Sequence, residues 1–295
     1  MRGRIIKALS GFYYVRPEGE EGLYKCRARG IFRLHELSPY VGDYCDFEVT
    51  HEGDREGNVL SIEDRRNQLF RPTVSNVDQA LLVFALRTPD PVLGLLDRFL
   101  IAMRRSAVPV ILNFNKSDLS DGQDISRFSR IYKDADVEMN FTSVVEEKGL
   151  DRLKSLLKGR TTVLAGPSGA GKSSLLNLLC GGDFMETQAV SRKIGRGKQT
   201  TRHIEMVRLS LTEKDPGYII DTPGFSSLFS PDFGSEKLQY YYPEFDSYRG
   251  DCYFQPCTHI HEPECAVKRA AENDLIPDER YESYKEVFNS MISRR

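Results

Sequence analysis

One segment of the sequence has the residue types and spacing of a phosphate-binding loop. Residues 166–173 read Gly-Pro-Ser-Gly-Ala-Gly-Lys-Ser, which fits the pattern G-x-x-x-x-G-K-[ST]. The glycines allow the backbone to curl, so that successive N–H groups point into one concavity at the start of a helix. A strand is predicted before the loop, over Thr161–Ala165, and a helix after it, over Ser174–Cys180. This context favours a site for nucleotide phosphates over a chance turn.

Two side chains of the loop have direct roles in phosphate binding. Lys172 has the length and charge to reach the terminal phosphates, and the hydroxyl of Ser173 can bind Mg²⁺. The residues that we predict to contact the nucleotide follow one another along the chain: Gly166, Pro167, Ser168, Gly169, Ala170, Gly171, Lys172, Ser173 and Ser174. The loop is therefore expected to hold a nucleotide together with Mg²⁺.

A second motif predicts which base the nucleotide carries. An apolar strand is predicted over Val108–Phe114. The four residues that directly follow it fit N-K-x-D: Asn115, Lys116, Ser117 and Asp118. The Asp118 carboxylate can accept hydrogen bonds from N1–H and the exocyclic amine of guanine, which adenine does not offer. Asn115 would contact the other edge of the base, and the aliphatic part of the Lys116 side chain would lie over the ring. Together with a phosphate loop, the motif indicates guanine. Phe141-Thr142-Ser143 is a further candidate loop, in which the Ser143 backbone would face the base.

The residues expected to respond to the γ-phosphate lie further along the chain. Asp221-Thr222-Pro223-Gly224 follows an apolar strand predicted over Tyr218–Ile220 and reads as D-x-x-G. Asp221 would hold Mg²⁺ through a water molecule, and the N–H of Gly224 would contact the γ-phosphate. Thr201 or Thr200 could bind Mg²⁺ from a switch loop between the two motifs. These motifs together predict a GTPase.

The residue that would orient the attacking water differs from the Ras pattern. Ras-like proteins place a glutamine after D-x-x-G, whereas this chain has Phe225, which cannot orient water. We therefore expect slow intrinsic turnover and help from another group. His203 is the nearest candidate in the sequence, and a structural or RNA-contacting role is the alternative for it.

The order of the motifs is itself unusual. The base motif precedes the phosphate loop and D-x-x-G, whereas conventional GTPases begin with the phosphate loop. The same fold is retained if the chain is cut after the D-x-x-G region and the old ends are joined, because chain termini usually lie close together at the surface. The order therefore predicts a circularly permuted GTPase domain.

A cluster near the end of the chain has the ligand types of a structural zinc site. Cys252, Cys257, His259 and Cys265 follow the spacing C-x4-C-x-H-x5-C. A closed set of three cysteines and one histidine leaves no open position, so we assign no catalysis to it. His261 competes with His259 by spacing. Zinc would add folding free energy that a block of about 60 residues lacks.

The pattern of apolar residues divides the chain into three blocks. Residues 1–68 contain five short alternating segments, which predict an OB-type β-barrel, with an SH3-like barrel as the alternative. Residues 69–232 alternate strands and helices, as in an α/β domain with a mostly parallel sheet. Residues 233–295 form a small α-rich zinc-binding domain that ends in an amphipathic helix. Arg65–Arg71 is predicted to be a linker, and Asp90-Pro91 is predicted to begin a helix.

The composition excludes several classes of protein. With 40% hydrophobic and 28% charged residues, the chain is not expected to be disordered. No apolar run in the sequence is long enough to span a bilayer. It begins without the apolar region of a secretory signal, so the six cysteines are expected to be reduced in the cytoplasm. A net charge of −2 excludes a uniformly basic nucleic-acid binder. Two basic segments remain: residues 1–35, with eight Lys and Arg against three Glu, and Thr187–Ile204.

These features together resemble one family. A barrel, a GTPase domain with N-K-x-D before the phosphate loop, and the C-terminal stretch CTHIHEPECAVK are similar to the bacterial small-subunit-dependent GTPases of the RsgA (YjeQ) family. The resemblance covers essentially the whole chain and implies that the three domains dock on the small ribosomal subunit. By the family motif His259, rather than His261, is the zinc ligand. Gln199 stands where many members have His, so a catalytic role at that position is not carried over.

The resemblance therefore implies a GTPase that assists late maturation of the small ribosomal subunit. The resemblance implies contacts with 16S rRNA and its proteins, and hydrolysis of GTP to GDP and phosphate that the subunit stimulates. We expect a monomer with one structural Zn²⁺, Mg²⁺ bound with GTP, and no membrane contact. There are two alternatives. One is a regulatory GTPase that switches a protein partner, and the other is a passive RNA-binding protein whose nucleotide site only controls its affinity.

Overall fold

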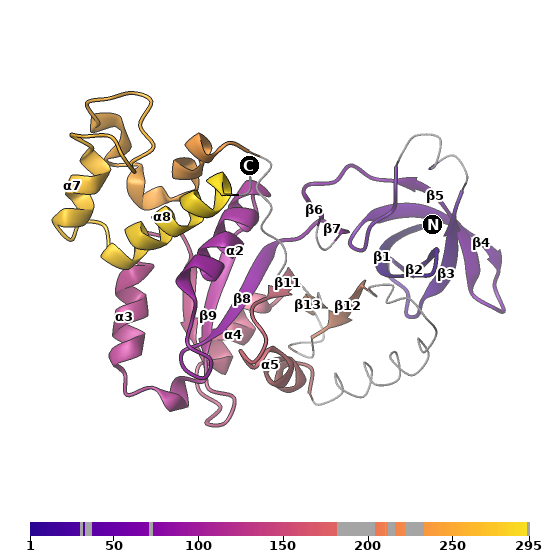
Figure 1. The fold of residues 1–295 in the computed structure, drawn as a ribbon. Coiled ribbons are helices and arrows are strands. Elements are labelled where there is room, and N and C mark those ends of the chain that lie inside the picture. Colours follow the sequence, from indigo (N-terminus) through magenta and orange to yellow (C-terminus); the bar gives the residue numbers. More distant parts are fainter. Residues whose placement is uncertain are drawn as a thin grey trace. The chain divides into compact units, whose positions relative to one another are not determined.

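The computed structural model of the protein describes residues 1–29, 32, 37–70, 73–181, 204–209, 211, 216–221 and 233–293 (Figure 1). The chain forms two compact units. Unit 1 comprises Met1–Ala80, Leu153–Ala165 and Ser173–Phe225, and unit 2 comprises Leu81–Arg152, Gly166–Lys172 and Ser226–Arg295. Within the described ranges, no helix combines the length and the apolar character that crossing a bilayer requires.

Unit 1 begins with a closed five-stranded barrel. Its strands are β1 (Arg2–Leu9), β2 (Phe12–Pro17), β3 (Tyr24–Ala28), β4 (Tyr44–His51) and β5 (Glu56–Ile62). They pair in the order β1-β2-β3-β5-β4, and β1 also pairs with β4, which closes the barrel. Every pair is antiparallel except β3–β5, which is parallel. The five predicted strands and the OB-type barrel are therefore confirmed.

The barrel interior is filled by the alternate residues of its strands. Ile5, Val15, Phe47 and Val59 have no exposed surface, and Phe32 packs with them. Cys26 and Cys45 belong to this core, and burial raises the pKa of Cys26 to about 11. These thiols act as small hydrophobic side chains.

Strand β1 pairs with β4 near its start and with β12 near its end. Arg2–Arg4 pair with β4, whereas Lys7 and Ala8 pair with β12 (Ile204–Arg208), opposite Glu205 and Ile204. The Lys7 ammonium also lies 3.2 Å from a carboxylate oxygen of Glu205. Strand β12 continues antiparallel to β13 (Tyr218–Asp221), which runs parallel to β11 (Thr161–Ala165). One continuous sheet thus joins the barrel to the strand that precedes the phosphate loop.

A short hairpin replaces the linker predicted over Arg65–Arg71. Strands β6 (Gln68–Phe70) and β7 (Thr73–Ser75) pair antiparallel, from Gln68 opposite Ser75 to Phe70 opposite Thr73. Arg65 is held by the buried carboxylate of Asp43, with Nε and Oδ1 2.8 Å apart. Residues 65–70 are therefore attached to the barrel, and the linker prediction was wrong.

Unit 2 contains the strands that carry the base motif. Strands β8 (Gln79–Ala85), β9 (Val110–Asn115) and β10 (Glu138–Phe141) lie in the order β10-β9-β8, and β9 and β10 are parallel. All residues of β9 are buried, as expected for a strand covered on both faces. Helices α2 (Leu93–Arg105) and α3 (Gln123–Ile131) and the turn η1 (Ser117–Leu119) connect them. Helices α4 (Leu150–Leu157) and α5 (Lys172–Leu179) begin in unit 2 and continue into unit 1.

The predicted start of α2 needs correction. Val92, rather than Asp90, is the N-cap residue, and it makes no side-chain capping bond. Before the helix, the carbonyl of Thr88 accepts a hydrogen bond from Lys116 Nζ at 2.5 Å. The helix therefore begins later than Asp90-Pro91 indicates.

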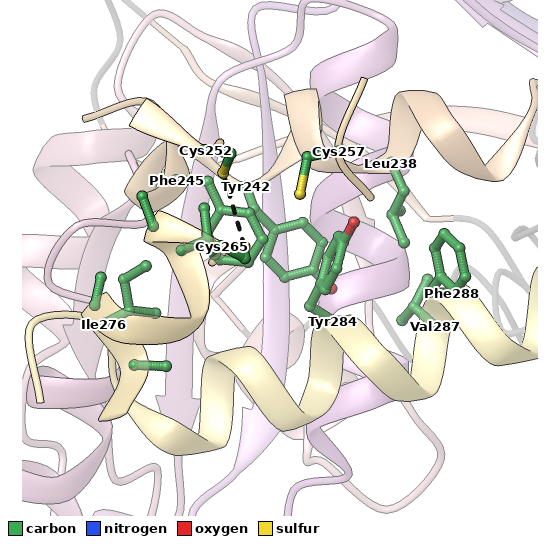
Figure 2. Packing of buried hydrophobic residues seen from close by; sticks show 14 of the residues in the cluster. Leu238, Tyr242, Phe245, Cys252, Cys257, Cys265, Ile276, Tyr284, Val287 and Phe288 are labelled. Atoms are coloured by element: carbon green, nitrogen blue, oxygen red, sulfur yellow. Dashed lines mark hydrogen bonds between the residues drawn. The ribbon is translucent and has the colours of Figure 1, made fainter. Parts of the chain in front are cut away.

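The C-terminal part of unit 2 is helical, as predicted. It consists of the short helices η3 (Ser235–Tyr241), η4 (Pro243–Phe245) and η5 (Arg249–Asp251), followed by α7 (Ala266–Glu272) and α8 (Asp278–Ile292). Figure 2 shows Tyr284, Val287 and Phe288 of α8 within a buried cluster that also holds three cysteines. Ile101 of α2 belongs to the same cluster, so these helices share one core with the base-motif part of the unit.

A buried ionic cluster also connects α8 with α2. Arg280 of α8, 1% exposed, donates from Nε to Glu244 Oε1 at 2.6 Å and from a terminal nitrogen to Asp97 of α2. The rings of Tyr132 and Tyr242 lie 4.9 and 4.8 Å from its guanidinium carbon. Burial opposes the charge, but Asp97 and Glu244 together raise the pKa of Arg280 well above its usual value. The cation is thus retained in the core.

Candidate functional site

The structure brings the predicted base motif and the phosphate loop together through Asn115. This residue ends β9 and is 2% exposed. Its Nδ2 donates to the backbone carbonyl of Ala170, in the phosphate loop, at 3.0 Å. Its Oδ1 accepts a hydrogen bond from Thr142 Oγ1, also at 3.0 Å. Two segments 55 positions apart are therefore joined by one buried amide.

The other residues of the base motif turn sharply after β9. Lys116 has φ +62°, in the left-handed region, and Ser117 N donates to the carbonyl of Thr142 at 3.0 Å. Asp118 Oδ1 accepts a hydrogen bond of 2.5 Å from Ser143 Oγ. The same hydroxyl oxygen accepts from the N–H of Glu146 at 3.0 Å, so Ser143 is fixed on both sides. The candidate loop Phe141-Thr142-Ser143 thus lies against the base motif.

The phosphate loop has the curled backbone that its glycines allow. Gly166 and Gly171 have φ +142° and +87°, and a Cβ at Gly166 would lie 2.0 Å from the carbonyl oxygen of Val83. A Cβ at Gly171 would lie 2.3 Å from Asn115 Nδ2. Both positions therefore require glycine for close packing as well as for conformation.

The polar side chains of the loop lie at the start of α5. Lys172 Nζ donates to the carbonyls of Gly166 and Pro167, at 2.8 and 2.6 Å, and so closes the loop across its own backbone. Ser168, Ser173 and Ser174 are exposed. An ammonium held beside a ring of N–H groups is a binding site for an anion.

Only part of the predicted γ-phosphate machinery falls within the described residues. Asp221 ends β13 and lies in register with Leu164, one residue before the end of β11. Its backbone therefore lies beside the strand that leads into the phosphate loop. Several predicted residues lie outside the described ranges: Gln199, Thr200, Thr201, His203, Gly224 and Phe225.

Four buried side chains near the C-terminus could hold a metal ion. The ligand atoms of Cys252, Cys257, His259 and Cys265 all lie within 4.8 Å of one another. Cys252 Sγ is 3.6 Å from His259 Nδ1 and 3.7 Å from Cys265 Sγ, and His259 Nδ1 is 3.3 Å from Cys265 Sγ. A tetrahedral ion with 2.3 Å bonds to sulfur has ligand atoms about 3.8 Å apart. The donor set and its spacing fit such an ion.

The surroundings of His259 decide which ring nitrogen faces the cluster. Gln239 Nε2 donates to the carbonyls of Cys257 and Glu236, at 3.0 and 3.2 Å, which leaves its Oε1 facing His259 Nε2 at 2.9 Å. Nε2 must therefore carry the proton, and Nδ1 presents its lone pair to the sulfur atoms. Burial lowers the pKa of His259 to about 4, so the ring is neutral. His261 is exposed, and the cluster contains His259 instead, as the family motif implies.

Sequence reasoning missed several residues that support these sites. Gln239 orients His259 from η3, and Glu262 accepts hydrogen bonds of 2.7 Å from the N–H and the hydroxyl of Thr258 in the cysteine loop. Burial by itself would raise the pKa of Glu262, but these bonds lower it to about 2. Neither residue stands at a spacing that marks a ligand or a cap, so no local signal identifies them.

Comparisons with known families cover most of the chain. The family model described as RsgA GTPase matches residues 62–230, and the RsgA N-terminal domain matches residues 2–58. A protein of Agathobacter rectalis named small ribosomal subunit biogenesis GTPase RsgA is 45% identical over 304 residues, which cover 100% of this chain and 99% of the relative. A protein of Geobacillus thermodenitrificans with the same name is 44% identical, with 99% and 98% covered.

Solved structures are similar over the same length. YjeQ from Thermotoga maritima has a TM-score of 0.82 and 33% identity, and covers 100% of this chain and 99% of its own. YloQ, described as a circularly permuted GTPase, has a TM-score of 0.78 and 37% identity, and covers 100% and 96%. The permuted order predicted from the motifs is thus found in a relative of the same fold. The chain belongs to the RsgA family of GTPases.

Proposed function

We propose that this GTPase binds the small ribosomal subunit and assists its late maturation, and that the subunit stimulates its hydrolysis of GTP to GDP and phosphate. The observation that carries the enzymatic part is the hydrogen bond from Asn115 to Ala170, which places the base motif against the phosphate loop. The partner is supported by the name that the curated relatives share, small ribosomal subunit biogenesis GTPase RsgA.

The nucleotide would be held at both ends by residues already in place. Ser143 holds one oxygen of Asp118, and the other oxygen would accept hydrogen bonds from guanine N1–H and the exocyclic amine. The N–H groups of residues 166–173 and the Lys172 ammonium would bind the phosphates. Because Lys172 bonds to carbonyls of its own loop, it is held close to the phosphate position before the nucleotide arrives.

Mg²⁺ would be held by Ser173 and Asp221. The Ser173 hydroxyl is exposed at the start of α5, Asp221 ends strand β13, and oxygen atoms of these types are the ligands that Mg²⁺ takes. Bound Mg²⁺ would neutralise charge that develops on the phosphates. We propose that Thr201, Gly224 and His203 contact the γ-phosphate. Because Phe225 cannot orient the attacking water, the small subunit would assist that step.

We further propose zinc as the metal of the cysteine cluster. Three thiolates and a neutral imidazole in a buried, closed set are the ligands that structural zinc prefers, and Gln239 supplies the outer hydrogen bond to His259. Metal analysis of the purified chain should give one Zn²⁺ per chain. Replacing Cys265 with Ser should abolish stoichiometric retention, whereas a Cys180→Ser variant, changed at a buried cysteine outside the cluster, should keep it.

The domain division proposed for the chain is 1–68, 69–232 and 233–295. The first two limits are supported by the family matches to residues 2–58 and 62–230, and the third by the cysteine cluster that follows them. The basic segment within residues 1–35 and the zinc-binding block are proposed as rRNA-contacting surfaces. The proposal includes a monomeric protein that works in the cytoplasm, where ribosomes mature; light scattering of the purified chain would check its mass.

The deciding experiment measures GTP turnover with and without purified small subunits, over a series of salt concentrations. We expect stimulation of at least tenfold that falls as salt rises, because phosphate contacts release counterions. Lys172→Ala, which removes the phosphate-binding ammonium, is the inactive control, and Lys133→Ala, at an exposed lysine outside the site, should behave as wild type. If small subunits do not change the rate of GTP turnover, the proposed partner is wrong. The nucleotide site would still be tested separately, by measuring GTP binding.

A further inference from the structure

A chain of buried polar side chains runs beneath the base motif, from β10 across β9 to the phosphate loop. Asn140 Nδ2 donates to Asn113 Oδ1 at 2.8 Å, and Asn113 Nδ2 donates to Thr142 Oγ1 at 2.9 Å. Thr142 Oγ1 donates to Asn115 Oδ1, whose Nδ2 donates to the carbonyl of Ala170, both at 3.0 Å. None of the four side chains belongs to a residue more than 2% exposed. We call these four residues the amide relay.

The pairing of the two strands explains how the relay forms. Strands β9 and β10 are parallel, with Asn113 opposite Asn140. Asn113 and Asn115 are two positions apart on β9 and so lie on one face of the sheet. Leu112 and Phe114 alternate with them and are fully buried. Polar groups in such a sheet are costly unless each finds a partner, and here each does.

The relay has a fixed direction because both ends are backbone carbonyls. At one end, Asn140 Nδ2 also donates to the carbonyl of Gly149 at 3.3 Å, so this amide presents its N–H groups to Asn113. At the other end, Ala170 accepts from Asn115. A carbonyl oxygen cannot donate, so neither terminal amide can turn over without placing two acceptors in contact.

The central hydroxyl transmits this direction. A threonine hydroxyl has one proton, and its oxygen here accepts the amide of Asn113. The proton is therefore directed to Asn115 Oδ1, and the NH₂ group of Asn115 faces the phosphate loop. One proton of that group goes to Ala170, and the second remains for an acceptor on the nucleotide.

We propose that Asn113 and Asn140 are positioning residues for guanine recognition, which act through Thr142 to hold the Asn115 amide as a donor toward the base. The inference rests on the proposed nucleotide site, in which Asp118 reads N1–H and the exocyclic amine. The opposite edge of guanine presents N7 as an acceptor, and this is the atom that the second Asn115 proton would reach. Neither Asn113 nor Asn140 touches the nucleotide in this arrangement.

The test compares the affinity of the full-length protein for GTP and for 7-deaza-GTP, which lacks the N7 acceptor. Competition against a fluorescent GTP analogue gives both dissociation constants. We expect wild type to bind 7-deaza-GTP about tenfold more weakly. A tenfold change in affinity corresponds to about 1.4 kcal/mol, which is near the upper end of the usual contribution of one hydrogen bond. In Asn113→Leu and Asn140→Leu this ratio should fall to about two, because the Thr142 hydroxyl is no longer directed at Asn115 Oδ1 and the Asn115 amide is positioned less firmly for N7.

The matched control changes the same strand on its other face. Leu112→Ala should destabilise β9 without touching the relay, so its ratio should stay near the wild-type value. Should both leucine variants fail to fold, Thr142→Val keeps the volume and removes only the hydroxyl, and Thr142→Ser keeps the hydroxyl. The ratio should fall in the former and persist in the latter.

The outcomes separate the inference from the proposed site. A wild-type ratio that persists in Asn113→Leu, Asn140→Leu and Thr142→Val assigns these residues to stability alone and overturns the inference. A wild type that prefers GTP to ATP but binds 7-deaza-GTP equally well also overturns it. If wild type does not prefer GTP to ATP, the base-recognition assignment itself is wrong.

Discussion

Asp118 is positioned to contact a base, because Ser143 holds one of its oxygens and, among the residues that the structure describes, no hydrogen bond is found to the other. Ser143 Oγ donates to Oδ1 at 2.5 Å and is itself held by Glu146 N. The second oxygen is thereby aimed by a short hydrogen bond from a fixed hydroxyl. Specificity at this residue depends on its being an acceptor only, as an ionised carboxylate is.

Asp118→Asn should therefore change the preferred base. An amide in place of the carboxylate can donate to the C2 oxygen of xanthine but opposes the guanine amine. We expect GTP affinity to fall at least tenfold and affinity for xanthosine triphosphate to rise, from the loss of a charged hydrogen bond of about 1.5–3 kcal/mol. Equilibrium binding of the two nucleotides measures this. Asp121→Asn, at an exposed aspartate nearby, is the control, and an unchanged preference in Asp118→Asn would refute the assignment.

Gly171 permits the contact between the two motifs. Gly171→Ala would place a Cβ 2.3 Å from Asn115 Nδ2, so it should break the bond to Ala170 and reduce GTP affinity at least tenfold. Gly19→Ala is the control, because its φ of +78° imposes similar backbone strain, about 1 kcal/mol, while nothing lies within 4 Å of the new Cβ. Titration with a fluorescent GTP analogue compares them. Equal affinities would show that the clash is relieved without moving Asn115.

Residue types at short spacing carried most of the site prediction. The phosphate loop, the base motif and the cysteine cluster are local patterns, and the structure brings each set together. Asn140, Gly149 and Gln239 reach their partners only through the register of β9 with β10 and the packing of η3. Because that register is a tertiary property, no spacing in the sequence marks them.

At the scale of elements, continuous apolar strands were the most predictable. Residues 161–165 form β11 as predicted, because a strand buried on both faces is an unbroken apolar run. The hairpin β6–β7 was missed, since three-residue strands are too short to show alternation. The start of α2 was misplaced because its N-cap residue, Val92, makes no side-chain capping bond, so no capping signal in the sequence marks it.

The contact between α2 and α8 depends on a buried cation. Arg280→Ala would leave Asp97 and Glu244 in the core without their partner, and we expect the free energy of unfolding to fall by about 3–5 kcal/mol. Arg152→Ala removes an arginine from an exposed pair with Glu138 and should cost less than about 1 kcal/mol. Urea unfolding followed by circular dichroism measures both. Similar losses in the two variants would contradict the importance of the buried cluster.

At the scale of the whole molecule, the metal cluster is connected to the base-motif part of unit 2. The hydroxyls of Tyr281 and Tyr284 on α8 donate to the carbonyls of His259 and Thr258, at 2.7 and 2.6 Å. The same helix packs on α2 through the shared core and Arg280. The zinc proposed for this cluster should therefore stabilise more than the cysteine loop alone.

Removal of the metal by a chelator should loosen α2 as well as residues 252–265. We expect amide hydrogen exchange in α2 to accelerate about tenfold or more, because its partner helix loses an anchor. Strands β4 and β5 belong to the barrel core of unit 1 and should exchange at the same rate with and without chelator. Mass spectrometry of peptides from both regions gives the comparison. Acceleration confined to residues 252–265 would show that the two cores are energetically separate.

Strand β1 has a consequence for the order in which the chain is synthesised. Residues 1–62 contain every strand of the barrel, so the barrel can close long before Ile204 has left the ribosome. Until β12 arrives, the β1 edge at Lys7 and Ala8 has backbone groups open to any other strand. A nascent chain, or a fragment that ends before β12, is therefore exposed to pairing with a second copy at that edge.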